Sequence, residues 1–144
     1  TRLVAEHFDW AHTVDRLKIA QRLSEQRPPE LAPLQVCIQV NVDGGATKAG
    51  VAPDEALALA REVAALPRLT LRGIMTIPEP SPDVATQLAV HQRARAVFDD
   101  LCTAGLALDT LSMGMTADLE AAVQAGSTMV RVGTAIFGGR ARAA

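Results

Sequence analysis

Long hydrophobic runs and blocks of basic residues are both absent from this sequence. No stretch approaches the ~18 uninterrupted apolar residues that a membrane-spanning helix needs, and the beginning of the chain lacks the basic and apolar regions of a signal peptide. The 144 residues carry a formal net charge of -2, and no basic segment interleaved with aromatic residues is present to neutralise a phosphate backbone. We therefore expect a cytoplasmic protein that binds neither membranes nor nucleic acids, and any anion that it binds should be small.

Cysteine and histidine are scarce as well. The two cysteines, Cys37 and Cys102, lie far apart in the sequence, and neither has a second cysteine at the spacing of a metal site. Both are predicted to be reduced residues of the core. The histidines form no recognisable ligand cluster. Among them, His91 falls on the apolar positions of a predicted helix, which favours packing over chemistry.

What the sequence does contain is an alternation of strand-like and helix-like segments. Its residues are 49% hydrophobic and 21% charged, a composition typical of a globular domain with a real core. Strands are predicted over residues 8–14, 34–42, 69–77, 109–115 and 128–133. Helices are predicted over residues 16–27, 53–66, 83–104 and 117–125. We expect Asp15 to cap the first helix, and Gly105 to end the third.

The alternation predicts an α/β fold with a parallel sheet. Strands joined through helices by short connections imply right-handed crossovers, and no linker or change of composition divides residues 1–144 into two domains. The pattern fits either an open doubly wound sheet or part of a barrel. A complete (β/α)₈ barrel usually needs ~200 residues or more, so in that case the chain would hold about the last five units. The first residue is Thr1 and not methionine, which favours a piece of a longer protein.

Two short motifs lie where the last two predicted strands end. "LSMGMT" places Ser112 and Gly114 at the end of one strand, and "RVGTAIFGG" places Gly133 and Thr134 at the end of the other. Ligands of parallel α/β folds collect at the C-terminal ends of the strands, and the loops after the last two strands of a barrel often hold a phosphate. Hydroxyl groups and glycine amides are sufficient to bind it. In the alternative interpretation, Gly133 only makes a turn and Ser112 only binds a backbone group.

A single arginine stands within the apolar run of the last predicted strand. Period-two alternation places Arg131 on the face opposite to its two valine neighbours, and in a barrel one of these faces is the interior. A guanidinium in that position needs an acceptor, because an unpaired buried charge is strongly destabilising. One alternative is a carboxylate such as Asp9, Asp15 or Asp43. The other is a ring nitrogen or a phosphate of a ligand.

The segment that contains these motifs, "LSMGMTADLEAAVQAGSTMVRVGTAIFG", resembles the C-terminal signature of the pyridoxal 5′-phosphate (PLP) homeostasis protein family. The similarity continues through "HFDWAHTVDRLKIAQRLSEQ", "VCIQVNVDGGATKAGV" and "LRGIMTIPEP", and so covers essentially the whole chain. The resemblance implies the C-terminal portion of a (β/α)₈ barrel of the alanine racemase type, with PLP at its C-terminal mouth. It assigns Ser112, Gly133 and Thr134 to the phosphate. Gly114, in the same motif as Ser112, is assigned to the same cofactor site. It assigns Arg131 to the pyridine nitrogen.

The chain departs from this family in its lysines. In the family, the lysine that forms a Schiff base with PLP lies on the first strand of the barrel, in a part that this chain lacks. The sequence contains Lys18 and Lys48. Lys18 is predicted to lie on the surface of a helix. Lys48 matches a lysine of the family's K-x-G segment, in a loop on the ligand side, and is therefore the candidate for contact with the cofactor.

Two functions are compatible with the resemblance. The first is a PLP-binding protein that supports the intracellular supply of PLP and the balance of amino acids, without an established reaction of its own. The second is a racemase of the same superfamily, which would need a second acid/base, commonly a tyrosine from a partner domain; the sequence has no tyrosine. PLP-dependent apoenzymes are the candidate partners, and the full-length protein is expected to be a monomer. The open strand edges of a partial barrel would favour self-association.

Overall fold

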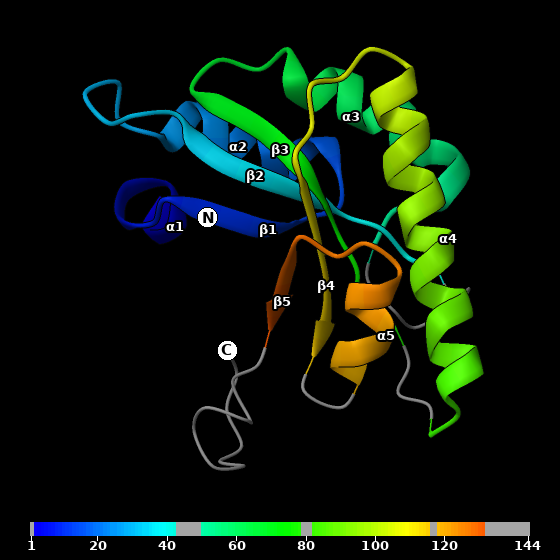
Figure 1. The fold of residues 1–144 in the computed structure, drawn as a ribbon. Coiled ribbons are helices and arrows are strands. Elements are labelled where there is room, and N and C mark those ends of the chain that lie inside the picture. The colour runs from blue at the N-terminus through cyan, green and yellow to red at the C-terminus, as the bar shows by residue number, and fades with distance from the viewer. Residues whose placement is uncertain (1, 43–49, 79–81, 116–117, 132–144) are drawn as a thin grey trace.

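The computed structural model describes residues 2–42, 50–78, 82–115 and 118–131. These residues contain a parallel sheet of five strands that follow one another in chain order (Figure 1). The strands are β1 Trp10–Val14, β2 Leu34–Gln39, β3 Leu69–Met75, β4 Thr110–Met115 and β5 Met129–Arg131. Each of the five predicted strands is thereby confirmed, and each is shorter than expected within the described residues.

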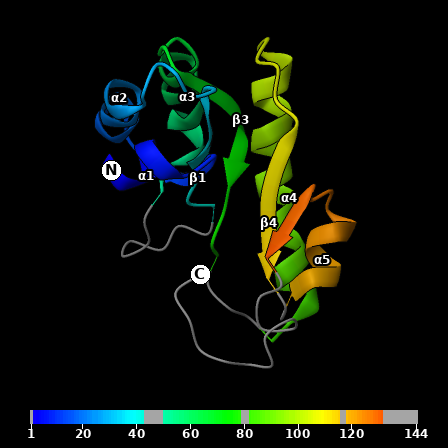
Figure 2. The same ribbon diagram turned by 90° about the vertical axis from the view of Figure 1, so that its left-hand side faces the viewer.

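The helices form a layer beside the sheet. They are α1 Arg2–His7, α2 Leu17–Gln26, α3 Ala56–Ala64, α4 Val84–Thr103 and α5 Leu119–Gln124, with a 3-10 turn, η1 Pro53–Glu55, leading into α3. Figure 2 shows α2 and α3 next to β1 and β3, and α4 and α5 next to β4. None of the helices in the described part of the chain combines the length and the hydrophobicity that crossing a membrane requires.

The order of the strands decides between the two predicted architectures. A doubly wound sheet reverses its strand order at a switch point and carries helices on both faces. Here the order is β1-β2-β3-β4-β5, and successive helices contact one another in the same order, α2 with α3, α3 with α4 and α4 with α5. The described residues therefore form a consecutive run of β/α units wound as in a barrel.

The core fills the space between the sheet and the helices. Alternate residues of β2, namely Leu34, Val36 and Ile38, face it and are fully buried. One side of α4 faces the same core through buried residues at helical spacing, which are Val90, His91, Ala94, Phe98 and Leu101. Burial of one large aliphatic side chain stabilises a fold by about 1.5 to 3 kcal/mol, so this layer is the main source of stability.

Two helix ends test the predicted boundaries. Gly105 directly follows the C-cap of α4 and has a φ angle of +104°, which confirms the predicted end of that helix. The predicted Asp15 cap of α2 is wrong. The N-cap position is occupied by Arg16 and has no side-chain hydrogen bond. The helix begins at Leu17, one residue later than a cap at Asp15 requires, and the carboxylate of Asp15 lies 3.9 Å from the Arg16 guanidinium.

The sequence did not predict α1, which is held in place by a buried arginine. Arg27 follows α2 and is only 4% exposed. Its guanidinium donates to the carbonyl oxygens of Ala5 at 3.0 Å and Phe8 at 2.6 Å. It also donates to the carbonyl oxygen of Ala32 from two nitrogens, at 2.9 and 2.7 Å. Because the carbonyl groups at the C-terminal end of a helix carry partial negative charge, they attract a cation. Arg27 therefore joins α1 to α2.

We expect Arg27→Met to lower the free energy of unfolding by about 3 kcal/mol. The substitution leaves buried carbonyl oxygens without their donor, and each such loss costs about 1 to 3 kcal/mol. Urea unfolding followed by circular dichroism measures the effect. Arg22→Met changes an exposed arginine of the same helix and should shift the value by less than about 0.5 kcal/mol. Equal losses for the two variants would contradict the role given to Arg27.

Candidate functional site

The face of the sheet that is turned away from the helices is concave. His12 on β1 and Ser112 on β4 belong to strands that are separated by β2 and β3. Nevertheless, the distance from His12 Nδ1 to Ser112 Oγ is 3.5 Å. Side chains of such distant strands meet only when the sheet curls strongly, as it does in a barrel. The inner face of the sheet therefore brings together residues that are remote in the sequence.

One layer of residues lies side by side on this inner face, at the C-terminal ends of β2 and β3, in the middle of β4 and at the start of β5. Residues that pair in register in parallel strands point to the same side of the sheet. The layer, called here the strand-end layer, consists of Gln39, Met75, Ser112 and Met129. The first three are buried. The layer thus offers an amide, a hydroxyl and two thioethers, and its four side chains carry no charge.

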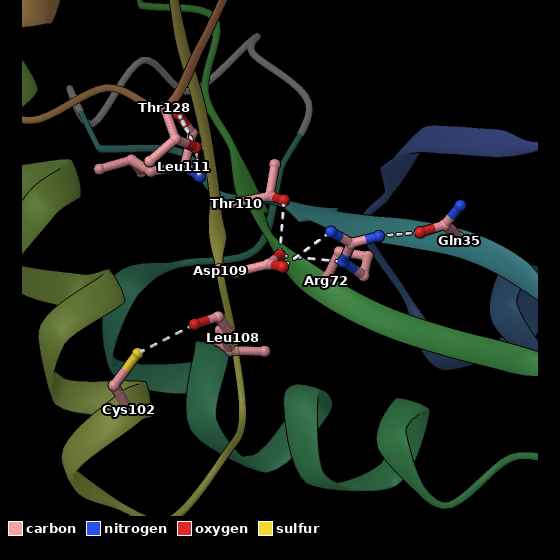
Figure 3. A network of polar contacts seen from close by, with 8 residues as sticks. All are labelled: Gln35, Arg72, Cys102, Leu108, Asp109, Thr110, Leu111 and Thr128. Carbon is pink, nitrogen blue, oxygen red and sulfur yellow. Dashed lines mark hydrogen bonds and ion pairs between the residues drawn. The ribbon is translucent and has the colours of Figure 1, made fainter.

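Toward the opposite ends of the strands, Arg72 organises a charged network (Figure 3). Its guanidinium binds Asp109 twice, from Nε to Oδ1 at 2.9 Å and from Nη2 to Oδ2 at 2.7 Å. It also donates from Nη1 to Oε1 of Gln35, and its Cζ lies 4.8 Å from the centroid of the Trp10 ring. The hydrogen bonds from Arg72 and then from Thr110 hold the pKa of Asp109 below its ordinary value. The hydrogen-bonding groups of this network bind one another, so the network has a structural role.

Cys37 places a thiol on the inner face of the sheet. It pairs in register with Gly73 on β3 and is fully buried. Burial raises the pKa of the Cys37 thiol to about 12, and the nearby charge of Arg72 offsets only part of this effect. Such a thiol stays protonated at neutral pH and is a poor nucleophile. Both cysteines are free, and Cys102 packs half-buried against the core, in agreement with the prediction of reduced core residues.

The end of β4 is fixed to the helices that follow and precede it. Gly114 has a φ angle of +98°, and a Cβ atom at this position would lie 2.3 Å from the Cβ of Ala122 on α5. The backbone N–H of Met115 donates to Asp118 Oδ1 at 2.7 Å. The other oxygen of this carboxylate, Oδ2, lies 2.7 Å from Nε2 of His91. His91 is fully buried in the core, as predicted, but it also connects α4 to the end of β4.

Two hydroxyl groups attach the short strand β5 to β4. Ser127 Oγ lies 2.7 Å from the carbonyl oxygen of Met113, to which it donates. Thr128 Oγ1 accepts a hydrogen bond from the backbone N–H of Leu111 at 2.7 Å (Figure 3). These contacts fix the start of β5, which is only three residues long, against its neighbour.

Three of the six predicted site residues lie in the part of the chain that the structure describes. Ser112 and Gly114 lie on β4, in the strand-end layer and at the junction with α5. Arg131 is the last residue of β5, and its backbone pairs in register with the end of β4, while its side chain is not described. The predictions for the remaining three residues fall outside the described part of the chain and stay predictions; these residues are Lys48, Gly133 and Thr134.

His12 and Asp118 are the residues of this region that the sequence did not single out. The contact of His12 with Ser112 joins positions 100 residues apart, so no spacing motif announces it. Asp118 does leave a local signal, because it occupies the N-cap position of α5. Its carboxylate binds the strand end and not the helix, which the sequence does not reveal. Lys18 is exposed on α2, as predicted.

The sequence is similar to known proteins over nearly its whole length. The family described as "Alanine racemase, N-terminal domain" matches residues 1–141. The chain is 60% identical over 140 residues to a protein of Pseudomonas aeruginosa and 54% identical over 140 residues to one of Escherichia coli. Both relatives are named pyridoxal phosphate homeostasis protein. Each alignment includes 97% of this chain, which spans 60% of the length of the relative.

Solved structures support the same relationship. PipY of Synechococcus elongatus without PLP has a TM-score of 0.82 and 33% identity, over 91% of this chain and 62% of that chain. PipY with PLP bound has a TM-score of 0.81 and 32% identity, over 91% and 61%. An alanine racemase of Clostridium difficile has a TM-score of 0.67 at 18% identity, over 85% and 31%, and this likeness shows the fold alone. The described strands are therefore part of a barrel of the alanine racemase N-terminal type.

Gly114→Ala should lower the free energy of unfolding more than Gly105→Ala does. The φ angles of these glycines are similar, +98° and +104°, so each substitution places alanine in the left-handed region at a cost of about 1 to 2 kcal/mol. The Cβ at position 105 meets no atom within 4 Å, whereas the one at position 114 collides with Ala122. We expect a further loss of about 1 to 3 kcal/mol for Gly114→Ala in urea unfolding. Equal losses would mean that α5 does not press on β4 at this point.

Proposed function

Because the chain belongs to the alanine racemase N-terminal domain family and, within it, to the pyridoxal phosphate homeostasis proteins, we propose that it forms the phosphate-binding part of a protein that binds PLP. The proposed role of this protein is to hold PLP and to support its intracellular supply and the balance of amino acids. The relative from Synechococcus elongatus, whose solved structure contains PLP, supports the proposal at 32% identity.

The observation that carries the proposal is the position of Ser112. Its hydroxyl lies on the concave face of β4, in register with the C-terminal residues of β2 and β3, and is fully buried. This is the end of a β/α barrel at which ligands bind, and a phosphate is often held there by the loops after the last strands. Gly114, two residues further on, gives the backbone the positive φ angle with which it leaves the strand.

The donors at this end of the sheet fit a phosphate together with an aromatic ring. Ser112 and Gln39 supply hydrogen-bond donors, while Met75 and Met129 supply thioethers, which pack favourably against aromatic rings. The strand-end layer contains no carboxylate that would repel a phosphate. The carboxylate of Asp109 is bound within the charged network toward the other end of the strands.

Arg131 is proposed to face the ring nitrogen of PLP. It lies two residues after Met129 on β5, and alternation along a strand supports its assignment to the same face. An arginine donates hydrogen bonds without giving up its proton, so it would leave the ring nitrogen unprotonated. PLP, when bound, supplies an aldehyde that reacts with amines and a ring that accepts electrons, weakly so if its nitrogen is unprotonated. Arg131 therefore favours storage of the cofactor over catalysis.

The remaining assignments follow from the family resemblance. Lys48, in the segment after β2, is proposed to approach the cofactor from the ligand side. The phosphate is assigned to Ser112, Gly133 and Thr134, and Gly114, in the same motif as Ser112, is assigned to the cofactor site. PLP-dependent apoenzymes as partners, a cytoplasmic location and a monomeric full-length protein stay predictions.

We propose further that residues 1–144 are a single domain made of the last five β/α units of the barrel. Support comes from the consecutive order of the strands and from the positions of Ser112 and Arg131 on the last two of them. The loops after the last two strands are the ones that hold phosphate in barrels of this type.

The proposed protein has no reaction of its own. The relatives from Pseudomonas aeruginosa and Escherichia coli carry a name that states no catalytic activity. The racemase alternative needs a second acid/base opposite the cofactor lysine, and these 144 residues supply no tyrosine for it. The likeness to alanine racemase does not favour this alternative, because at 18% identity it concerns the fold alone.

Ser112→Ala should weaken PLP binding roughly 10- to 100-fold. A hydrogen bond to a charged group contributes about 1.5 to 3 kcal/mol, and each 1.4 kcal/mol is about a factor of ten in affinity. Fluorescence titration of the purified protein with PLP measures the dissociation constant. Ser24→Ala is the matched control, since it removes a buried hydroxyl that binds the carbonyl oxygen of Pro67, remote from the strand ends. Unchanged affinity in Ser112→Ala, or an equal loss in both variants, would contradict the phosphate site.

Arg131→Glu should change the absorption spectrum of bound PLP. A carboxylate beside the ring nitrogen would raise the proton affinity of that nitrogen, and protonation of the ring alters its electronic transitions. Absorbance spectra recorded over a range of pH compare the wild type with Arg131→Glu. Arg131→Gln, which introduces no negative charge, should raise the proton affinity less. Identical spectra for the wild type and the Glu variant, both loaded with PLP, would refute the assignment of Arg131 to the ring nitrogen.

A further inference from the structure

His91 is a fully buried titratable residue to which the proposed function gives no role. It lies on α4, with Nε2 at 2.7 Å from Asp118 Oδ2. The other carboxylate oxygen of Asp118 accepts the backbone N–H of Met115 at 2.7 Å. One carboxylate thus bridges a core histidine and the last residue of β4. Met115 is the last residue of β4, three positions after Ser112, so the bridge lies at the end of β4 where the phosphate is proposed to bind.

The hydrogen-bond pattern assigns the proton of the imidazole. Among the described residues, His91 Nδ1 is buried and has no hydrogen-bond partner. A proton on Nδ1 would therefore be a buried donor without an acceptor, which is unfavourable. A neutral ring with its proton on Nε2 avoids this cost and donates to the carboxylate of Asp118. Both oxygens of Asp118 are then occupied by N–H donors, one from a side chain and one from the backbone.

The bridge controls how the chain leaves β4. The peptide between Gly114 and Met115 is held at both ends, by the contact of Gly114 with Ala122 and by the bond from Met115 to Asp118. A planar peptide that is fixed at both ends has a single orientation. The carboxylate itself is also restrained. Without the donor from His91, it would be held by the N–H of Met115 alone, and this peptide would lose its fixed position at the end of β4.

We propose that His91 is a positioning residue for the phosphate end of the PLP site. It acts through Asp118, whose carboxylate it holds against the backbone N–H of Met115. The inference rests on the proposed function, because it assumes that the phosphate lies at the end of β4. It predicts that a donor at position 91 matters specifically for ligands that carry a phosphate.

Two substitutions of His91 separate this role from simple packing. His91→Leu keeps a side chain of similar size but removes the donor, whereas His91→Gln provides a side-chain N–H that can reach Asp118. We expect His91→Leu to weaken PLP binding about tenfold, which corresponds to the loss of about one hydrogen bond. Binding of pyridoxal, which lacks the phosphate, should not change. His91→Gln should stay within about twofold of the wild type.

Further variants control for loss of stability. Phe98→Leu disturbs the same buried side of α4 without touching Asp118, and it should lower stability but leave PLP affinity unchanged. All titrations are made at a temperature at which circular dichroism shows each variant to be folded. Asp118→Ala removes the acceptor at a position 19% exposed, and it provides the test if His91→Leu does not fold. The same selective loss of PLP affinity is expected for it.

A second readout does not depend on the cofactor. The amide proton of Met115 donates to a carboxylate in the ligand-free protein, so its NMR resonance should lie downfield. It should move upfield in His91→Leu and stay in place in His91→Gln. An unmoved resonance in His91→Leu would overturn the inference.

The PLP titrations distinguish failure of the inference from failure of the proposed function. If Ser112→Ala weakens PLP binding but His91→Leu does not, the inference is overturned and the proposed function stands. The inference is also overturned if His91→Leu weakens PLP and pyridoxal equally. If the wild-type protein does not bind PLP, or if Ser112→Ala binds it as well as the wild type, the proposed function fails and the inference fails with it.

Discussion

The strands follow one another in chain order, and the helices pack in the same order against one face of the sheet. This winding curves the sheet, so that its opposite face becomes the inner face of a partial barrel. Polar side chains on that face then meet across strands that are not neighbours. The contact of His12 with Ser112 is one result, and the position of Arg72 over the ring of Trp10 is another. Each polar group on the inner face therefore depends on other strands for its partners, and the curvature of the sheet determines which groups meet.

This inner face separates charge along the direction of the strands. Toward the strand starts, the ion pair of Arg72 and Asp109 balances its own charge. Toward the strand ends, the strand-end layer around Ser112 is uncharged. Asp118 is the acidic residue that follows Ser112 most closely in the sequence, and both of its oxygens are engaged by Met115 and His91. An anion beside the strand-end layer would meet the hydrogen-bond donors of Ser112 and Gln39, while the carboxylate of Asp118 is already engaged.

The strands and the long helices could be predicted because their apolar residues repeat with a clear period, and because Gly105 ends α4. The helix α1 could not, since it has only six residues and its position depends on Arg27, far along the chain. In the site, Ser112 and Gly114 could be placed at a strand end from one local motif. The contact between Ser112 and His12 could not, because it arises only when the curved sheet brings positions 100 residues apart together.

The partners of Arg27 determine how the fold responds to acid. Those that the described residues supply are the peptide carbonyls of α1 and of the turn after α2. Peptide carbonyls take up no proton in the pH range in which carboxylates do. The pair of Arg72 and Asp109 loses its attraction once falling pH protonates Asp109. Acidification would therefore loosen the inner face of the sheet first, while the first helix stays attached to its neighbour.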